Sequence, residues 1–180
     1  MKEKDIISEL VKKLKKGDEK AAFQLYNQYS KSMYNTLVRI CGDHDDAKDA
    51  LQNTFITAFT KINQLKDEQG FGAWLKKITV NAGLELLRKK TSFMDKVNDI
   101  DLPKIEEEEE ELIFTERQIH EAIQLLPTGS RLVVNLYLIE GYAHKEIAKK
   151  LRIKESTSKT QYKRGKELLR IQLRKQLQHG

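Results

Sequence analysis

Apolar residues recur at helical spacing along most of the chain, whereas sustained alternation of apolar and polar residues does not occur. A first apolar stripe at residues 6–14 ends at Gly17, and Asp18 is placed to cap the helix that follows. That second helix is expected to end at Cys41-Gly42, because glycine commonly terminates helices. The pattern therefore predicts an all-α fold.

Two further helices are expected over residues 43–62 and 71–90, separated by a polar loop over residues 63–70. The first of these helices has four carboxylates in its first turns, where negative charge is favourable near the helix dipole. The acidic start has two interpretations, a simple adaptation to the dipole and a docking surface for a basic partner. The residues themselves leave both open.

The helix over residues 71–90 divides into an apolar side and a polar strip. Trp74, Ile78 and Ala82 are expected to line the core side. The polar strip, whose members fall within about 80° of one another around the helix, consists of Lys77, Asn81, Glu85 and Arg88. It is either a solvent-exposed face with a local Glu85–Arg88 pair or a DNA-contacting surface, with Lys and Arg on phosphates and Asn on a base. Spacing alone is compatible with both.

The second half of the chain again predicts helices. One is expected over residues 116–126, where Pro127 ends it, and an apolar one over residues 131–139, which leads into Gly141.

Residues 141–174 predict a helix-turn-helix. The first helix has an apolar face centred on Ile147, and a short break follows. In that break Arg152 holds the position where a left-handed residue, usually glycine, is expected. The second helix is expected to begin at Ser156 or Thr157, both of which are good N-caps.

The second helix of this motif has two contrasting sides. The side expected to pack inward carries Ser158, Tyr162, Gly165, Leu169 and Leu173. The side expected to face outward carries Lys159, Thr160, Lys163, Arg164, Arg170 and Arg174, with Arg164 on its flank and placed for a phosphate. A basic, hydroxyl-bearing face is found both on solvated amphipathic helices and on helices that enter a major groove. The preceding helix and the tight turn favour the second interpretation.

Charge is distributed unevenly. The chain has 180 residues and a net charge of +6. Residues 141–180 are strongly basic, whereas residues 93–113 contain nine acidic and two basic residues, including six consecutive glutamates. Like charges in a row repel one another, so this segment predicts a flexible acidic linker between two small helical domains. The expected domains are residues 1–92 and 114–180, both facing nucleic acid.

Several classes of protein are disfavoured. The single cysteine, Cys41, excludes a disulfide framework and a cysteine-based zinc site, and the four histidines show no metal-ligand spacing. No Ser/His/Asp set and no phosphate-binding glycine loop is present, so neither catalysis nor a cofactor is expected. The N-terminus predicts an amphipathic helix rather than a signal peptide, and no apolar run reaches about 18 residues, which favours a cytoplasmic protein without membrane insertion.

Two separated blocks of residues, in this order, resemble an extracytoplasmic-function (ECF, group IV) sigma factor of bacterial RNA polymerase, in the sigma-70 family. The first block contains Asp46-Ala47, Asp49, Gln52, Phe55, Phe71, Ala73-Trp74-Leu75, Lys77-Ile78, Asn81 and Leu87-Arg88. The second contains Leu126-Pro127, Leu136, Glu140-Gly141-Tyr142, Lys145-Glu146-Ile147-Ala148, Leu151, Ile153, Thr157, Lys159, Arg164 and Leu168-Leu169-Arg170. The alternative is a free-standing helix-turn-helix regulator, against which the polar loop and the acidic linker argue. A third class, a DNA-processing enzyme, lacks the clustered carboxylates it would need.

The resemblance implies a role for each surface. Its partners would be the core RNA polymerase (beta-prime clamp helices and beta flap), promoter DNA and a candidate anti-sigma factor, in a stress response. Residues 1–92 would be sigma region 2 and residues 114–180 region 4, and the linker would thread toward the RNA exit path. Polymerase binding would fall to Asp46, Asp49 and Gln52, although Lys48 and Asn53 stand where the family often has acids. The −10 element would be contacted by Asn63, Gln64, Lys66, Lys77, Asn81, Glu85 and Arg88, and the −35 element by Ser156, Thr157, Lys159, Thr160, Lys163 and Arg164.

Overall fold

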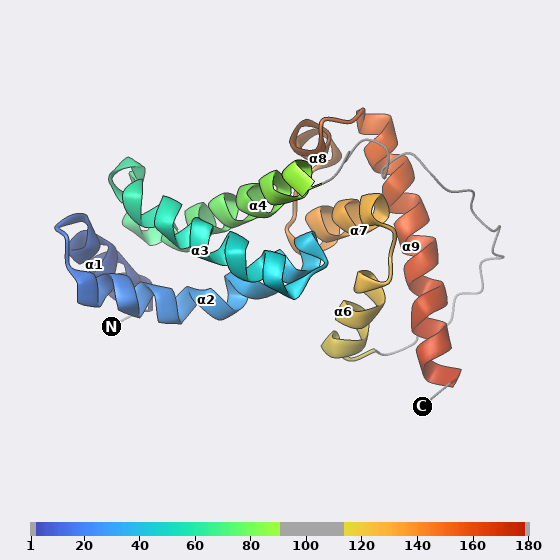
Figure 1. The fold of residues 1–180 in the computed structure, drawn as a ribbon, viewed down its shortest axis with the longest axis horizontal. Helices are drawn as coiled ribbons and strands as arrows, with labels where there is room; N and C mark the ends of the chain where they lie inside the picture. Colours follow the sequence, from blue (N-terminus) through green and yellow to red (C-terminus); the bar gives the residue numbers. More distant parts are fainter. Residues whose placement is uncertain (1–2, 91–113, 179–180) are drawn as a thin grey trace. The chain divides into compact units, whose positions relative to one another are not determined.

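A computed structural model describes residues 3–90 and 114–178, and within these ranges every regular element is helical (Figure 1). The all-α prediction is therefore confirmed. The chain separates into two compact units, Met1–Lys89 and Lys90–Gly180. The predicted linker, residues 93–113, lies outside the described residues, so the domain boundaries stay predictions. In the described ranges no helix combines the length and apolar character that a membrane span requires.

The first unit is built from helices whose ends are fixed by local chemistry. Asp18 caps the second helix by accepting hydrogen bonds from the backbone N–H groups of Lys20 and Ala21, as predicted. Gly42, at φ 73°, ends that helix in the left-handed conformation, and Asp43 caps the next one. The elements are α1 (Glu3–Lys15), α2 (Glu19–Cys41), α3 (His44–Thr60), the 3-10 turns η1 (Ile62–Gln64) and η2 (Glu68–Gly70), and α4 (Phe71–Lys90). Helices α2 and α3 run antiparallel (Figure 1).

The core of this unit joins α1 to α2, α3, η1 and α4. Its buried members are Ile7, Val11, Leu25, Met33, Phe55, Ala58, Ile62, Leu65, Phe71 and Leu75. Because Ile62 and Leu65 belong to the segment between α3 and α4, that segment is packed on the core and is not a free loop.

The predicted core side of α4 is confirmed in part. Trp74 and Ile78 are half-buried and pack against the core, while the buried positions of this helix include Leu75, Thr79 and Gly83. Thr79 is satisfied in the core because its hydroxyl donates to the Leu75 carbonyl at 2.9 Å. A Cβ at Gly83 would lie 3.0 Å from side-chain atoms of α2, so the missing side chain permits close packing of α2 and α4. A search for apolar periodicity overlooks both residues.

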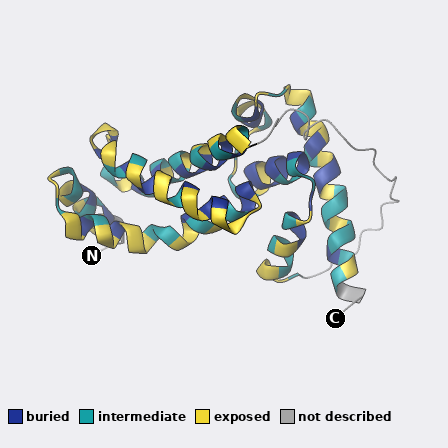
Figure 2. Cartoon of the chain, in the orientation of Figure 1, coloured by how far each residue is buried: buried dark blue, intermediate teal, exposed yellow. Residues whose placement is uncertain are grey.

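The second unit packs three short helices against one long helix. Its elements are α6 (Glu116–Gln124), α7 (Thr128–Val134), a π-helical turn η3 (Asn135–Ile139), α8 (His144–Leu151) and α9 (Glu155–Gln178). Helix α9 contacts α6, α7 and α8, and buried residues gather on α7 and on the part of α9 beside it (Figure 2). The apolar helix expected over residues 131–139 is confirmed in part: the helical stretch ends at Ile139 as expected, but it starts earlier, at Thr128, and changes from α-helix to a π-turn at Asn135.

Candidate functional sites

The helix-turn-helix of the second unit is present as predicted, with α8 as its first helix and α9 as its second. Arg152 adopts the left-handed conformation, at φ 56° and ψ 43°, and it is the one non-glycine residue with positive φ among the described residues. The backbone N–H groups of Arg152 and Ile153 both donate to the Ala148 carbonyl, which closes the end of α8.

The predicted start of the second helix was wrong. Helix α9 begins at Glu155, so Ser156 and Thr157 lie in its first turn and do not cap it. Only three residues, 152–154, separate the end of α8 from the start of α9. The first helical hydrogen bond of α9 runs from the Ser158 N–H to the Lys154 carbonyl, so the helix begins before Ser156. The Ser156 carbonyl is engaged within the helix, where it accepts from the Thr160 hydroxyl at 3.0 Å.

We define the α9 face as four of the exposed polar residues in the first three turns of α9: Ser156, Lys159, Thr160 and Lys163. Lys159 pairs with Glu155 at 2.8 Å, and this hydrogen-bonded ammonium holds the pKa of the Glu155 carboxyl below its ordinary value. Thr157, also predicted to contact DNA, is half-buried at the edge of this face.

Arg164 does not lie on the α9 face, contrary to the prediction. Its exposed fraction is 6%, and its neighbour Gln161 is also buried. The helix wheel placed Arg164 on the flank of the outer side. Because α9 packs against α6, α7 and α8, its buried sector is wider than the apolar residues alone indicate.

The segment between α3 and α4, residues 61–70, presents its polar side chains to solvent. Asn63, Gln64 and Lys66 are exposed, while Ile62 and Leu65 anchor the segment in the core. The expected loop therefore consists of two 3-10 turns, and we call it the 61–70 loop.

The polar strip on α4, here the α4 strip, is also exposed: Lys77, Asn81 and Glu85 face solvent, and Arg88 is half-buried. Glu85 forms an ion pair with Lys89 at 3.0 Å, four residues further along the same helix. The hydrogen bond from Lys89 holds the pKa of the Glu85 carboxyl below its ordinary value.

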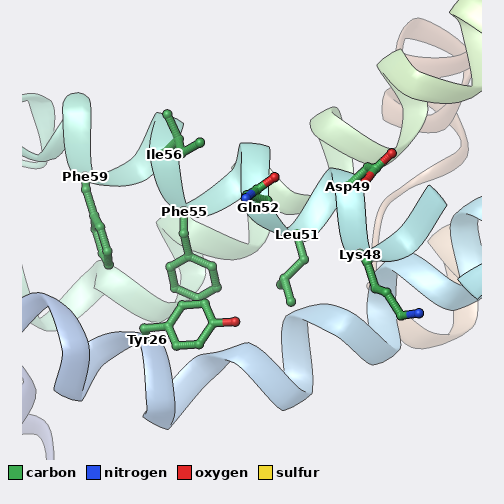
Figure 3. Close-up of a pocket in the computed structure, with 8 residues that line it drawn as sticks. All are labelled: Tyr26, Lys48, Asp49, Leu51, Gln52, Phe55, Ile56 and Phe59. Carbon is green, nitrogen blue, oxygen red and sulfur yellow. The ribbon is translucent and has the colours of Figure 1, made fainter. Parts of the chain in front are cut away.

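A third surface lies between α2 and α3. A groove of about 560 Å³, the α2/α3 groove, is lined by Tyr26, Lys48, Asp49, Leu51, Gln52, Phe55, Ile56 and Phe59 (Figure 3). The Tyr26 and Phe55 rings lie 4.7 Å apart between the helices, whereas Asp49 and Ile56 project away from α2 (Figure 3). Ile56 is 59% exposed, an apolar side chain beside the polar Gln52.

Asp46, which was predicted to share this surface, does not lie on it. Its exposed fraction is 9%, and it falls on the side of α3 that also carries the buried Ala47 and Ala50. Helical geometry explains the difference, because residues four apart share a face and Ala50 follows Asp46 by four. Among the described residues, no group of His, Cys, Asp and Glu is arranged to hold a metal ion.

Comparison with known families identifies both units. Residues 25–93 match the model of sigma-70 region 2, and residues 116–169 match the model of sigma-70 region 4. The ECF RNA polymerase sigma factor SigW of Bacillus subtilis is 31% identical over 185 residues, which cover 94% of this chain and 97% of that protein. The chain belongs to the ECF sigma factors. This sigma factor is thus an alternative initiation factor for transcription, and a free-standing helix-turn-helix regulator is not favoured because the first unit matches region 2.

Solved structures share the fold of this sigma factor. A structure of CnrH in complex with the cytosolic domain of CnrY has a TM-score of 0.54 and 20% identity, covering 93% of this chain and 96% of that chain. The sigma factor RpoE from Bartonella quintana, solved with the anti-sigma factor NepR, has a TM-score of 0.53 and 18% identity, covering 84% of this chain and 95% of that chain.

Two features of this sigma factor escaped sequence reasoning. Tyr26 and Ile56 are both exposed in the α2/α3 groove, and neither was among the candidate site residues. Ile56 follows Gln52 by four residues, so helical spacing predicts that the two side chains lie on the same face of α3.

Proposed function

We propose that the three exposed surfaces of this sigma factor divide the work of initiation. The α9 face reads the −35 element, the 61–70 loop and the α4 strip act on the −10 element as it melts, and the α2/α3 groove binds core RNA polymerase through Asp49 and Gln52. The protein itself performs no chemistry, and it acts in the cytoplasm with the polymerase.

The observation that carries this proposal is the exposure of Lys159, Thr160 and Lys163 in the first two turns of α9. This is the part of a recognition helix that enters the major groove. Lysine and threonine side chains there reach base edges and phosphates.

Promoter opening is driven by binding energy in this proposal. Unstacking a base costs a few kcal/mol, which contacts from the exposed polar groups of the 61–70 loop and the α4 strip offset. Asn63 and Gln64 carry amides that hydrogen-bond base edges, and Lys66 and Lys77 carry positive charge for phosphates.

We further propose that an anti-sigma factor holds this sigma factor inactive. RpoE of Bartonella quintana was solved with such a partner, and that likeness is the support for this step. The protein would then be released when a stress signal removes the partner.

Run-off transcription with purified core polymerase tests the main proposal. The template is a promoter library in which the −35 and −10 elements are randomised at fixed spacing. We expect transcripts only when this protein is added, with sequence preference at both elements. A protein that binds core polymerase yet supports no transcript from the library contradicts the proposal.

A further inference from the structure

Lys15, at the end of α1, ties together the two turns of the 61–70 loop. Its Nζ donates to the Leu65 carbonyl at 2.7 Å and to Glu68 Oε1, also at 2.7 Å. Leu65 directly follows η1, and Glu68 begins η2. One ammonium therefore bridges the last part of the first turn and the start of the second.

The bridge is shielded and its donor is held in place. The side chains of Lys15 and Glu68 are 22% and 25% exposed, well below those of the Lys13–Glu9, Lys48–Asp45 and Lys89–Glu85 pairs. Helix α1 is fixed on the core through Ile7 and Val11, which pack in the same cluster as Leu65. The hydrogen bond from Lys15 also holds the pKa of the Glu68 carboxyl below its ordinary value, so the carboxylate is charged at neutral pH.

The exposed polar residues of the loop lie on either side of the bridged carbonyl. Asn63 and Gln64 precede Leu65, and Lys66 follows it. Fixing the Leu65 carbonyl restricts the backbone from which these side chains project. A loop ordered before DNA arrives avoids the entropic cost of ordering it on binding.

We propose that Lys15 is a positioning residue for −10 recognition: by bridging the Leu65 carbonyl and the Glu68 carboxylate, it sets the geometry in which the 61–70 loop takes up an unstacked base. This inference rests on the proposed function of that loop. Helix α1 precedes the segment that matches sigma-70 region 2, which begins at residue 25, so the role falls on a part of the chain outside the family match.

The test uses holoenzyme on promoters that carry each of the four bases at every −10 position. Lys15→Met removes both hydrogen bonds and keeps the aliphatic stem. We expect it to reduce base discrimination at one −10 position about five- to tenfold. A change of this size corresponds to the loss of roughly one hydrogen bond to a charged group. Lys13→Met is the matched control, because it removes one charge from the same turn of α1 and breaks only the exposed pair with Glu9. It should leave discrimination unchanged.

Two further variants separate the possible causes. Lys15→Arg retains a donor and should recover at least part of the discrimination. Glu68→Gln weakens one arm of the bridge, and combined with Lys15→Met it should add nothing further. The fluorescence of Trp74, the single tryptophan, reports the folding of this unit during the same series.

Each outcome decides the matter. If Lys15→Met keeps full discrimination, or lowers transcription equally for all bases in proportion to a lower melting temperature, Lys15 has no positioning role. If Lys15→Met does not fold, Glu68→Gln decides: reduced discrimination supports the inference, and unchanged discrimination overturns it. The double variant Asn63→Ala/Gln64→Ala tests the loop itself. Unchanged discrimination there refutes the proposed function of the loop, whereas lost discrimination there with an unaffected Lys15→Met refutes only the role of Lys15.

Discussion

His144 Nδ1 and Ser158 Oγ lie 2.9 Å apart, in a hydrogen bond that joins the first residue of α8 to the buried side of α9. The Tyr137 ring stacks on the imidazole at 4.4 Å, and the Tyr162 ring meets it edge-on at 5.6 Å. Ser158 occupies a position where an apolar side chain is more usual. Its hydrogen bond to His144, on the other helix, explains why a polar residue is accommodated there. The pair fixes how the two helices of the motif meet.

Replacing Ser158 with alanine should destabilise the second unit. We expect the free energy of unfolding to fall by about 1 kcal/mol, because a buried hydrogen bond is lost. The measurement is urea unfolding followed by far-UV circular dichroism. Ser156→Ala, an exposed serine two residues earlier, is the control and should change the free energy by less than about 0.5 kcal/mol. Equal stability of the two variants would show that the hydrogen bond contributes nothing.

The seam between α7 and α9 depends on Gly165. A Cβ built at Gly165 would lie 2.4 Å from Val134 Cγ2. Alanine in a helix is favoured over glycine by about 1 kcal/mol, but overpacking typically costs about 1–3 kcal/mol. We expect Gly165→Ala to lower the melting temperature of the second unit and to leave the Trp74 fluorescence transition of the first unit unchanged.

Val134→Ala supplies the control for that change, since it removes the atom that the new Cβ would meet. The double variant Gly165→Ala/Val134→Ala should be more stable than the sum of the two single changes predicts. Strict additivity would mean that the contact is relieved by movement elsewhere.

The sequence predicted those features that local chemistry determines. Asp18, Asp43 and Gly42 define helix ends through their own side chains or conformation, and Arg152 was placed correctly by its position after an apolar helix. Burial of polar residues was not predictable in this way. Asp46 lies on the side of α3 that packs inward. An analysis of apolar periodicity assigns a charged residue to the exposed side of a helix, so it predicts the wrong side for Asp46.

The same reason accounts for the misplaced flank of α9. A helix wheel assumes one packing partner, whereas α9 has three, so Arg164 and Gln161 are both buried although Thr160, four residues before Arg164, is exposed. The relationship between Lys15 and the 61–70 loop was equally invisible, because it joins residues 50 and 53 positions apart.

The α2/α3 groove should be the polymerase-binding surface. We expect Asp49→Lys and Gln52→Ala each to weaken association with core polymerase while helical content stays constant, because both side chains are exposed. Affinity is measured by fluorescence anisotropy of labelled protein. Glu9→Lys makes the same charge change at an exposed position on α1 and should bind normally. Asp46→Ala should instead lower the melting temperature, since this carboxylate is buried. Normal assembly by both groove variants would place the binding surface elsewhere.

The α4 strip should act after the promoter has been bound as duplex. We expect Asn81→Ala and Arg88→Ala to reduce strand opening more than duplex binding, because the helix directly follows the loop proposed to capture a base. Permanganate footprinting reports opening, and an electrophoretic shift reports binding. Asn35→Ala, an exposed asparagine on α2, is the matched control. Unchanged opening in both strip variants would exclude the strip from melting.

Lys163 and Arg164 are adjacent in sequence, yet replacing them should affect different properties: the −35 base preference for Lys163 and the stability of the second unit for Arg164. Lys163 is exposed on the α9 face, so Lys163→Ala should cost about 1–3 kcal/mol at one base pair and relax the −35 preference there. Arg164 is buried, so Arg164→Ala removes packing and should lower the free energy of unfolding of the second unit by about 1–3 kcal/mol. The sequence alone had assigned Arg164 to a phosphate, which predicts an even loss of activity and a weaker salt dependence.

A randomised −35 selection, a thermal melt and a salt titration of promoter binding distinguish these outcomes. Lys175→Ala, at an exposed position near the end of α9, makes the same charge change as Lys163→Ala and should alter none of the three. If Arg164→Ala melts normally but shows a shallower salt dependence, the side chain leaves its buried position to reach DNA. If Ser156, Lys159, Thr160 and Lys163 are all replaced by alanine and the −35 preference persists, the α9 face does not read the promoter, because none of its polar side chains remains to make base contacts.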